Sequence, residues 1–236
     1  MTGVLYLVPN ALGDTAALAS VLPEPVRALA ARLTYYVGEN AKSTRAFLKK
    51  TGGTIPIQDI EIRELNVNTP ANAIDALLAP IIAGCDGGLL SEAGCPAVAD
   101  PGALLVRRAH ERGIRVVPLV GPSSILLALM GSGLNGQSFA FHGYLPVDAA
   151  QRTKKLRELE QQSRRARQTQ IFIETPYRNR VMLDVLASAC APDTLVCVAV
   201  DLTLPDEQIV TRPVSVWRKE PIELHKRPAI FLMLAN

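Results

Sequence analysis

Short apolar runs alternate with helix-length amphipathic segments through the first half of the chain. The runs at 4–8, 34–37, 87–90 and 114–120 have the length and apolar character of buried strands, and the last is typical of a strand covered on both faces. This alternation indicates a layered α/β domain with a mainly parallel sheet. The segments between the runs are predicted as a helix that Asp14 caps and that ends near Ser20, helices over 43–50, 70–82 and 103–112, and an extended piece over 57–65.

The pattern changes after Gly121-Pro122. Helices are predicted over 123–130, 149–168 and 178–189, and strand-like runs follow one another closely at 139–144, 170–173, 195–200, 207–211, 214–217 and 229–234. Strands spaced this closely suggest hairpins and an antiparallel edge. We therefore expect two α/β domains, a doubly wound, mainly parallel one over 1–120 and a second with a mixed sheet over 121–236.

Two loops interrupted by Gly and Pro follow predicted strands. Residues 91–102 read Ser-Glu-Ala-Gly-Cys-Pro-Ala-Val-Ala-Asp-Pro-Gly, and Gly121-Pro122-Ser123-Ser124 comes about twenty residues later. Backbone N–H groups are left unpaired where a strand gives way to a helix, so ligands bind at such strand ends. Gly94 allows close backbone approach to a ligand, while Pro96 restricts the loop. The sequence predicts one ligand crevice formed by both loops.

Composition narrows the class of protein. The chain has 236 residues and 48% hydrophobic content, enough for a sizeable core, and no apolar run reaches the length of a membrane span. The start lacks the basic region of a signal peptide, so we expect a cytoplasmic protein. The four cysteines and three histidines fit neither zinc spacing nor a disulfide framework, so we expect reduced cysteines and no metal.

Positive charge is concentrated in one predicted helix. Residues 151–168 carry seven Lys or Arg and two Glu, a net charge of +5 against +3 for the whole chain. Such a stripe can follow the phosphates of an RNA, or it can be an ordinary solvated helix face. Both readings remain open at this point.

Several familiar chemistries are excluded by missing motifs. Val8-Pro9-Asn10-Ala11-Leu12-Gly13 follows the first strand in place of Gly-x-Gly-x-x-Gly, and the chain has neither a phosphate loop nor a Gly-x-Ser-x-Gly elbow. Enzymes that use nicotinamide cofactors or nucleoside triphosphates are therefore not expected, nor are serine hydrolases of that type.

Five ordered motifs give the chain a family resemblance. These are SEAGCPAVADPG, GIRVVPLVGPSS, FAFHGYLP, the basic stretch after it and IFIETPYRN. Together they resemble the tetrapyrrole methylase superfamily, the class III S-adenosylmethionine-dependent methyltransferases. The nearest branch methylates the 2′-oxygen of a cytidine in small-subunit ribosomal RNA. Residues 91–96 resemble its Ser-Asp-Ala-Gly-Thr-Pro motif, and residues 174–178 resemble its Glu-Ser-Thr/Pro-His-Arg motif.

The resemblance implies a homodimer of two-domain chains with S-adenosylmethionine held in a cleft between the domains. Asp100 is expected either to bind the cofactor's amine or to cap the helix near residue 103, and Ser123 and Ser124 to cap a helix or offer hydroxyls to the cofactor. The expected cofactor-binding residues are Pro9, Ser91, Glu92, Ala93, Gly94, Pro96, Asp100, Ser123, Ser124 and Glu174. The expected catalytic residues are Glu39, Lys42 and Arg178.

The chain departs from the branch in two places. Glu39-Asn40-Ala41-Lys42 stands where the branch has Glu-Asp-Thr-Arg, and Lys is a point charge that cannot reproduce the bidentate contact of Arg. Many members also continue into a basic C-terminal extension, whereas this sequence ends at Asn236. The helix over 152–167 is expected to supply the RNA contact instead.

Three functions are compatible with these observations. The first is methylation of an RNA ribose, favoured by the basic helix and the motif match. The second is C- or N-methylation of a tetrapyrrole or another small molecule, although those relatives usually carry a Gly-x-Gly-x-Gly-Asp/Glu-Pro motif that is missing here. The third is a non-catalytic descendant that binds RNA or protein, suggested by Asn40 and Lys42.

Overall fold

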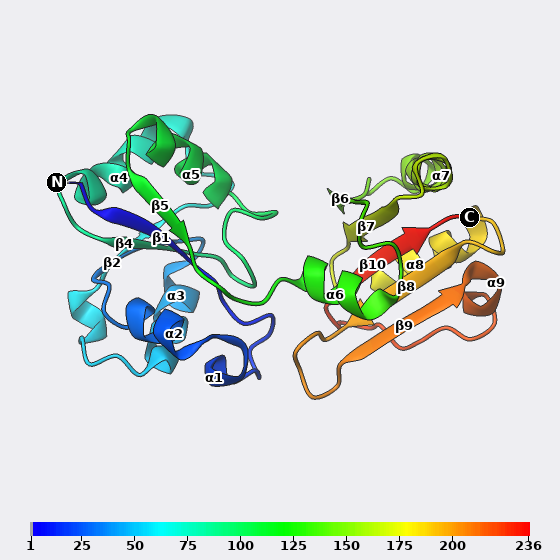
Figure 1. The fold of residues 1–236 in the computed structure, drawn as a ribbon, viewed down its shortest axis with the longest axis horizontal. Helices are drawn as coiled ribbons and strands as arrows, with labels where there is room; N and C mark the ends of the chain where they lie inside the picture. The colour runs from blue at the N-terminus through cyan, green and yellow to red at the C-terminus, as the bar shows by residue number, and fades with distance from the viewer. Residues whose placement is uncertain (1) are drawn as a thin grey trace. The chain divides into compact units, whose positions relative to one another are not determined.

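A computed structural model describes residues 2–236 and divides the chain into two compact units, Met1–Ser123 and Ser124–Asn236. Each unit has its own sheet (Figure 1), and each has its own hydrophobic core. We describe the units one at a time.

The first unit is built on a five-stranded parallel sheet. Its strand order is β3-β2-β4-β1-β5. The strands are β1 (Val4–Val8), β2 (Tyr35–Gly38), β3 (Glu61–Glu64), β4 (Gly87–Leu90) and β5 (Arg115–Pro118). Because the strands are parallel, β1, β2, β4 and β5 all end at the same edge of the sheet, and the loops that follow them meet there.

Helices cover both faces of this sheet. In Figure 1, α4 and α5 lie on one face and α2 and α3 on the other. The helical segments are α1 (Leu18–Val21), α2 (Glu24–Ala30), α3 (Ala41–Thr51), η1 (Ile57–Asp59), η2 (Ala71–Ala73), α4 (Ile74–Ile82) and α5 (Gly102–Glu111). The apolar faces of α4 and α5 form one core with β1, β2 and β4, which includes Leu5, Val37, Leu78 and Leu105.

Two glycines of the central strand β4, Gly87 and Gly88, leave room for the rings of Tyr35 and Tyr36 on β2. A Cβ atom on Gly88 would lie 2.5 Å from Cε1 of Tyr36, and one on Gly87 would lie 2.9 Å from Cδ1 of Tyr35. Both tyrosines are buried, and their hydroxyls donate hydrogen bonds to the carbonyls of Leu77 and Ala30. Burial raises the pKa of Tyr35 to about 12, so its hydroxyl keeps the proton that it donates.

The second unit contains a mixed sheet with the strand order β6-β7-β10-β8-β9. β6 and β7 are parallel, whereas β10 is antiparallel to β7 and β8, and β9 is antiparallel to β8. The strands are β6 (Phe139–Tyr144), β7 (Thr169–Ile173), β8 (Leu195–Val200), β9 (Gln208–Pro213) and β10 (Ala229–Leu234).

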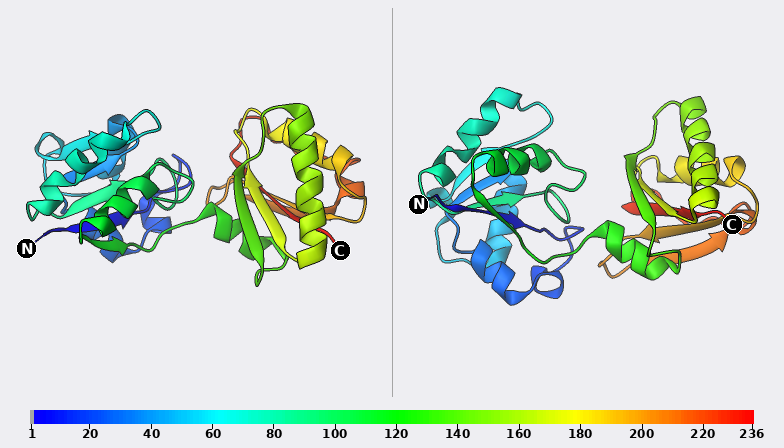
Figure 2. Two further views of the ribbon diagram at one scale, coloured as in Figure 1. Left: turned by 90° about the horizontal axis from the view of Figure 1, so that it is seen from above. Right: turned by 45° about the horizontal axis from the view of Figure 1, so that its top comes forward.

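Four helices accompany this sheet. They are α6 (Ser124–Ser132), α7 (Ala149–Ala166), α8 (Asn179–Ala189) and α9 (Val214–Trp217). Figures 1 and 2 show α6 on one face and α7 and α8 on the other. The larger core lies under α7 and α8 and includes Leu156, Phe172, Leu183 and Phe231.

The α/β fold class expected from the sequence is confirmed, but four local predictions are wrong. The first helix is only α1, its N-terminal residue is preceded by Ala17, and Asp14 does not cap it. The sequence analysis also missed α2, although Pro25 near its start is a common signal for a helix beginning.

The other two errors concern strands. Residues 214–217 form α9 instead of a strand, since the chain turns after Pro213 and Trp217 packs into the core, where its Nε1 donates to the carbonyl of Val196 at 2.9 Å. The strand expected to be covered on both faces is β5, which lies at the edge of the sheet and is at most half-buried. An edge position also explains how the strand accommodates Pro118.

Two absences apply to residues 2–236. None of their helices is long and apolar enough to cross a membrane, and they contain no cluster of three or more His, Cys, Asp or Glu residues able to hold a metal ion. All four cysteines are free thiols.

Candidate functional site

The loop after β4 has a defined shape that its own polar groups maintain. The Ser91 hydroxyl lies 3.2 Å from the carbonyl oxygens of both Ala93 and Gly94. Asp100 Oδ1 accepts hydrogen bonds from the backbone N–H groups of Ala97, at 2.9 Å, and Gly102, at 2.7 Å. Gly102 is the first residue of α5 and Pro101 is its N-cap, so Asp100 lies one residue before the cap and accepts the first N–H group of the helix.

Part of the same loop is held in a backbone conformation that is uncommon for residues with side chains. Ala97 and Ala99 have φ angles of 65° and 59°, in the left-handed region. Such a conformation costs on the order of 1 kcal/mol per residue and persists only when surrounding contacts require it. At Ala97 the hydrogen bond from its N–H to Asp100 supplies such a contact, and backbone strain of this kind is common at ligand sites.

The loop after β1 joins the loop after β4. Asn10 and Gly94 exchange two backbone hydrogen bonds of 2.9 and 3.2 Å, and Asn10 Nδ2 donates to the carbonyls of Ser91 and Glu92. Gly94 has a φ of 69°, which glycine adopts without strain. Asn10 was not among the residues expected from the sequence, and its only signal was its place directly after the first strand.

The loop after β5 completes this cluster within the first unit. The Cys95 thiol donates to the carbonyl of Pro122 at 3.4 Å. Pro9 lies so close to Gly121 that a Cβ atom there would be 2.3 Å from the Pro9 ring. The two loops singled out in the sequence therefore do lie together, and the loop after β1 connects them.

Glu39 follows β2 and faces the loop after β4. Its Oε1 accepts a hydrogen bond of 3.5 Å from the backbone N–H of Glu92. Burial raises the pKa of Glu39, and the negative charges of Asp100 and Glu92 raise it further, although the Glu92 N–H acts in the opposite direction. A carboxylate with a raised pKa is better suited to accept a proton near neutral pH than an ordinary exposed glutamate.

The replaced residue Asn40 has a structural role. Its Oδ1 accepts from the backbone N–H groups of Lys42 and Ser43, which caps α3. Asn and Asp are about equally good at this position, so the neutral residue keeps the cap. The side chain of Lys42 is exposed, and Ser43, which the sequence analysis did not select, donates to Glu92 Oε1 at 2.5 Å.

Three of the expected site residues belong to the second unit. Ser124 begins α6, and Glu174 and Arg178 lie in the turn between β7 and α8. Glu174 is buried, and its Oε1 accepts from Arg178 Nε at 3.0 Å, from Arg178 Nη2 at 2.5 Å and from the backbone N–H of Thr175. Glu174 therefore orients the Arg178 guanidinium.

The basic helix expected from the sequence is α7, but one of its cations is not on the surface. Arg152 is buried, and its Nη1 donates to the carbonyls of Pro146 and Val147. Glu160 is buried too, where it accepts from Ala191 N and Thr194 Oγ1. The remaining cations are exposed or half-buried: Lys154, Lys155, Arg157, Arg164, Arg165 and Arg167.

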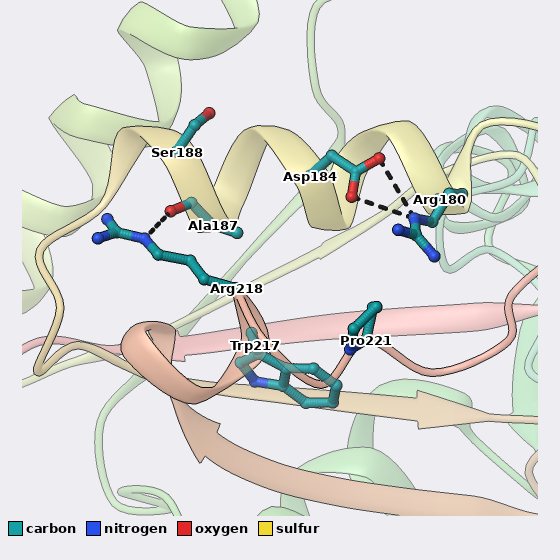
Figure 3. A pocket seen from close by; sticks show the side chains of 7 residues that line it. All are labelled: Arg180, Asp184, Ala187, Ser188, Trp217, Arg218 and Pro221. Atoms are coloured by element: carbon teal, nitrogen blue, oxygen red, sulfur yellow. Dashed lines mark hydrogen bonds and ion pairs between the residues drawn. The ribbon is translucent and has the colours of Figure 1, made fainter.

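A pocket of about 330 Å³ lies elsewhere on the second unit, between α8 and residues 217–221 (Figure 3). Its two arginines already have partners. Arg180 pairs with Asp184 at 3.1 Å, and Arg218 donates to the carbonyls of Ala187 and Cys190 at the end of α8. These contacts stabilise the end of α8 and leave little reason for an anion to bind.

Comparison with known proteins identifies the family to which this architecture belongs. Residues 16–216 match the sequence profile of the tetrapyrrole (corrin/porphyrin) methylases. The fold is similar to the crystal structure of the methyltransferase CobJ, with a TM-score of 0.65 and 18% identity over 99% of this chain and 95% of that one. It is also similar to the cobalt precorrin-4 methyltransferase CbiF, with a TM-score of 0.60 and 16% identity over 98% and 94% of the two chains.

Sequence similarity is higher to another group of relatives. The chain is 30% identical to the ribosomal RNA small subunit methyltransferase I of Escherichia coli O157:H7, over 98% of this chain and 77% of that protein. It is 33% identical to the protein of the same name from Xylella fastidiosa, over 85% and 69%. The chain belongs to the tetrapyrrole methylase family and is an S-adenosylmethionine-dependent methyltransferase, as the sequence motifs indicated.

Proposed function

We propose that this methyltransferase acts on the 2′-hydroxyl of a cytidine ribose in small-subunit ribosomal RNA. The observation that carries this proposal is the similarity to ribosomal RNA small subunit methyltransferases over 98% of the chain. The exposed cations of α7 support it, because they offer a surface that an RNA phosphate backbone can contact.

The loop cluster of the first unit suits S-adenosylmethionine. Asp100 is half-buried and uses only Oδ1 to hold the loop, so Oδ2 can accept a hydrogen bond from the cofactor's ammonium group. The backbone of Ala93 and Gly94 can approach the ligand closely. The other residues that we assign to cofactor binding are Pro9, Ser91, Glu92, Pro96, Ser123, Ser124 and Glu174.

We assign the acceptor's proton to Glu39. Bound S-adenosylmethionine supplies an electrophilic methyl group, and the ribose hydroxyl must lose its proton as it becomes the nucleophile. Glu39 accepts that proton on its carboxylate, whose pKa is raised by burial. The other residues that we assign to catalysis are Lys42, whose amine is exposed, and Arg178, whose guanidinium is oriented by Glu174.

We also propose that the protein forms a homodimer. Large apolar side chains are exposed on both units, and Val120 and Met130 are exposed by 72% and 78%. Exposed apolar surface of this kind is often covered by another chain. Light scattering coupled to gel filtration tests this proposal, and a mass of one chain at micromolar concentration would contradict it.

The decisive experiment is a methyl-transfer assay with defined acceptors. Purified protein and radiolabelled S-adenosylmethionine are incubated with small ribosomal subunits from a strain that lacks its own methyltransferase I, and in parallel with a tetrapyrrole. We expect label in the RNA, in a dinucleotide that resists alkaline hydrolysis because its 2′-oxygen is methylated. Label in the tetrapyrrole alone would support the second function considered above, and label in neither would contradict both enzymatic readings.

A further inference from the structure

A second cavity of the second unit lies at the C-terminal end of α7, and one of its two arginines, Arg167, has no partner for its side chain among residues 2–236. It has a volume of about 480 Å³ and is lined by Asn135, Arg164, Arg167, Leu234, Ala235 and Asn236. Two guanidinium groups line it, and no acidic side chain does. This composition differs from that of the pocket in Figure 3, where both arginines have partners.

The two arginines of this cavity keep most of their hydrogen-bonding capacity. Arg164 uses Nε to donate to the main-chain oxygen of Asn236 at 2.6 Å, and its Nη groups have no hydrogen bond or ion pair with residues 2–236. The guanidinium of Arg167 likewise has no such partner among the residues that the structure describes. A planar guanidinium with free donors is the group best suited to bind a phosphate.

The backbone around Arg167 is fixed on both sides. Its N–H donates to the carbonyl of Ser163, and its carbonyl accepts from Asn135 Nδ2 at 2.6 Å. Asn135 is itself held, because its carbonyl accepts from Thr169 Oγ1 at 2.9 Å. The Arg167 side chain therefore extends from an anchored residue at the cavity wall, which reduces the entropy lost on binding a ligand.

The end of a helix carries partial negative charge, which opposes binding of an anion. This charge is equivalent to about half an elementary charge and falls off within one turn. Here the guanidinium of Arg167 stands against it with a full positive charge, and Arg164 adds the part of its charge that its contact with the Asn236 main-chain oxygen leaves over. The Asn135 amide and the Ser163 hydroxyl occupy the carbonyls of Arg167 and Gln168. The balance in the cavity favours an anion.

We propose that this cavity binds a phosphate of the RNA backbone between Arg164 and Arg167. This inference rests on the proposed function, because it names where the RNA substrate contacts the second unit. Arg157 lies seven residues before Arg164, about two helical turns away on the same side of α7, so the contact continues along the exposed cations of the helix. A strand bound this way contacts the helix at several successive phosphates.

The test measures RNA binding as a function of salt. Fluorescence anisotropy with a labelled fragment of small-subunit ribosomal RNA is recorded at several salt concentrations for the wild type, for Arg167→Gln and for Arg164→Gln/Arg167→Gln. The matched control is Arg107→Gln on α5, which removes the same charge from an arginine whose side chain is 80% exposed. Circular dichroism checks that every variant is folded.

We expect Arg167→Gln to reduce the slope of log affinity against log salt by about one and the double variant by about two, with Arg107→Gln unchanged. Equal slopes for Arg167→Gln and Arg107→Gln would overturn the inference. If the wild type methylates small subunits but the slopes are equal, only this inference fails; if the wild type neither binds nor methylates RNA, the proposed function fails with it.

A second readout separates an RNA strand from free phosphate. Phenylglyoxal modifies accessible arginines, and mass spectrometry locates the modification. We expect the RNA fragment to protect Arg164 and Arg167, with inorganic phosphate at millimolar concentration protecting them weakly. Protection by inorganic phosphate without protection by RNA would overturn the proposal, because the cavity would then bind the free anion.

Discussion

At the scale of single residues, the most informative group is the Asp100 carboxylate, whose two oxygens have different tasks. Oδ1 holds the loop through Ala97 and Gly102, and we assign Oδ2 to the cofactor. Burial raises the pKa of Asp100, although the two backbone N–H groups lower it again. Asp100 is therefore expected both to hold the loop through Oδ1 and to bind the cofactor through Oδ2. A substitution that keeps one oxygen acceptor but removes the charge can separate the two roles.

We predict that Asp100→Asn keeps the loop but weakens cofactor binding. The amide oxygen can replace Oδ1, whereas the charge that attracts the ammonium group is lost. A hydrogen bond to a charged group contributes about 1.5–3 kcal/mol, so affinity should fall at least about tenfold. Calorimetric titration with S-adenosylhomocysteine measures this. Asp59→Asn on the same unit is the control, and equal affinities for the two variants would contradict the assignment.

The second prediction at this scale concerns pH. Because the pKa of Glu39 is raised, its carboxylate becomes protonated at a higher pH than that of an ordinary glutamate as the pH falls. If Glu39 is the base, kcat/KM should decline on the acid side with a midpoint above the usual glutamate value. The measurement is a pH profile of methyl transfer, with Glu39→Gln expected to lose activity at least about a hundredfold. An unchanged rate in Glu39→Gln, as expected for the exposed Glu24→Gln, would rule out this role.

At the scale of elements, Asn40 is neutral where the related branch has a charged Asp, yet it keeps the cap of helix α3. It caps α3 by accepting from Lys42 N and Ser43 N. We predict that Asn40→Ala lowers the free energy of unfolding of the first unit by about 1 kcal/mol, whereas Asn40→Asp, which restores the residue of the branch, leaves it nearly unchanged. Urea unfolding followed by circular dichroism measures both. Equal losses in the two variants would show that the side-chain acceptor is not what stabilises α3.

The elements also show what the sequence could predict. The strands at 4–8, 87–90, 195–200 and 229–234 were predicted with their observed bounds, because a strand in the middle of a sheet has a continuous apolar run. Residues 214–217 misled the analysis because Val214 and Val216 favour strands, while the packing of Trp217 determines a helical turn. Tertiary contacts far along the chain decided the outcome there.

The candidate site was predictable in part for a similar reason. Gly94, Pro96 and Asp100 are recognisable from their spacing, since glycine and proline restrict the local backbone. Asn10 and Ser43 make their important contacts with residues 81 to 82 and 49 positions away, which a local pattern cannot reveal. The burial of Arg152 was hidden because a helix with many cations shows no sequence signal for which one points inward.

At the scale of the whole molecule, the two units have separate cores and only one contains a tryptophan. Trp217, the single tryptophan of the chain, is buried in the second unit. Its fluorescence therefore reports on that unit, whereas circular dichroism reports on both. This difference allows the stability of each unit to be followed separately.

We predict that Gly88→Ala destabilises the first unit selectively. The added methyl group would meet the buried ring of Tyr36, and overpacking of this kind costs about 1–3 kcal/mol. In thermal unfolding, part of the circular dichroism signal should change at a lower temperature while the Trp217 fluorescence transition keeps its midpoint. Gly136→Ala, where no atom lies within 4 Å of the new Cβ and φ is not left-handed, is the comparison for replacing a glycine without a clash. A shared downward shift of both signals would mean that the units unfold together.

The network around Asn10, Ser91 and Asp100 has a consequence for how this family varies. The hydrogen bonds that shape the loop join the side chains of Asn10, Ser91 and Asp100 to main-chain groups, and the Cys95 thiol donates to the Pro122 carbonyl. A threonine hydroxyl, which the related branch carries there, offers a donor of the same kind. Cysteine and threonine at this position can therefore donate the same hydrogen bond, so the loop can keep its shape with either residue.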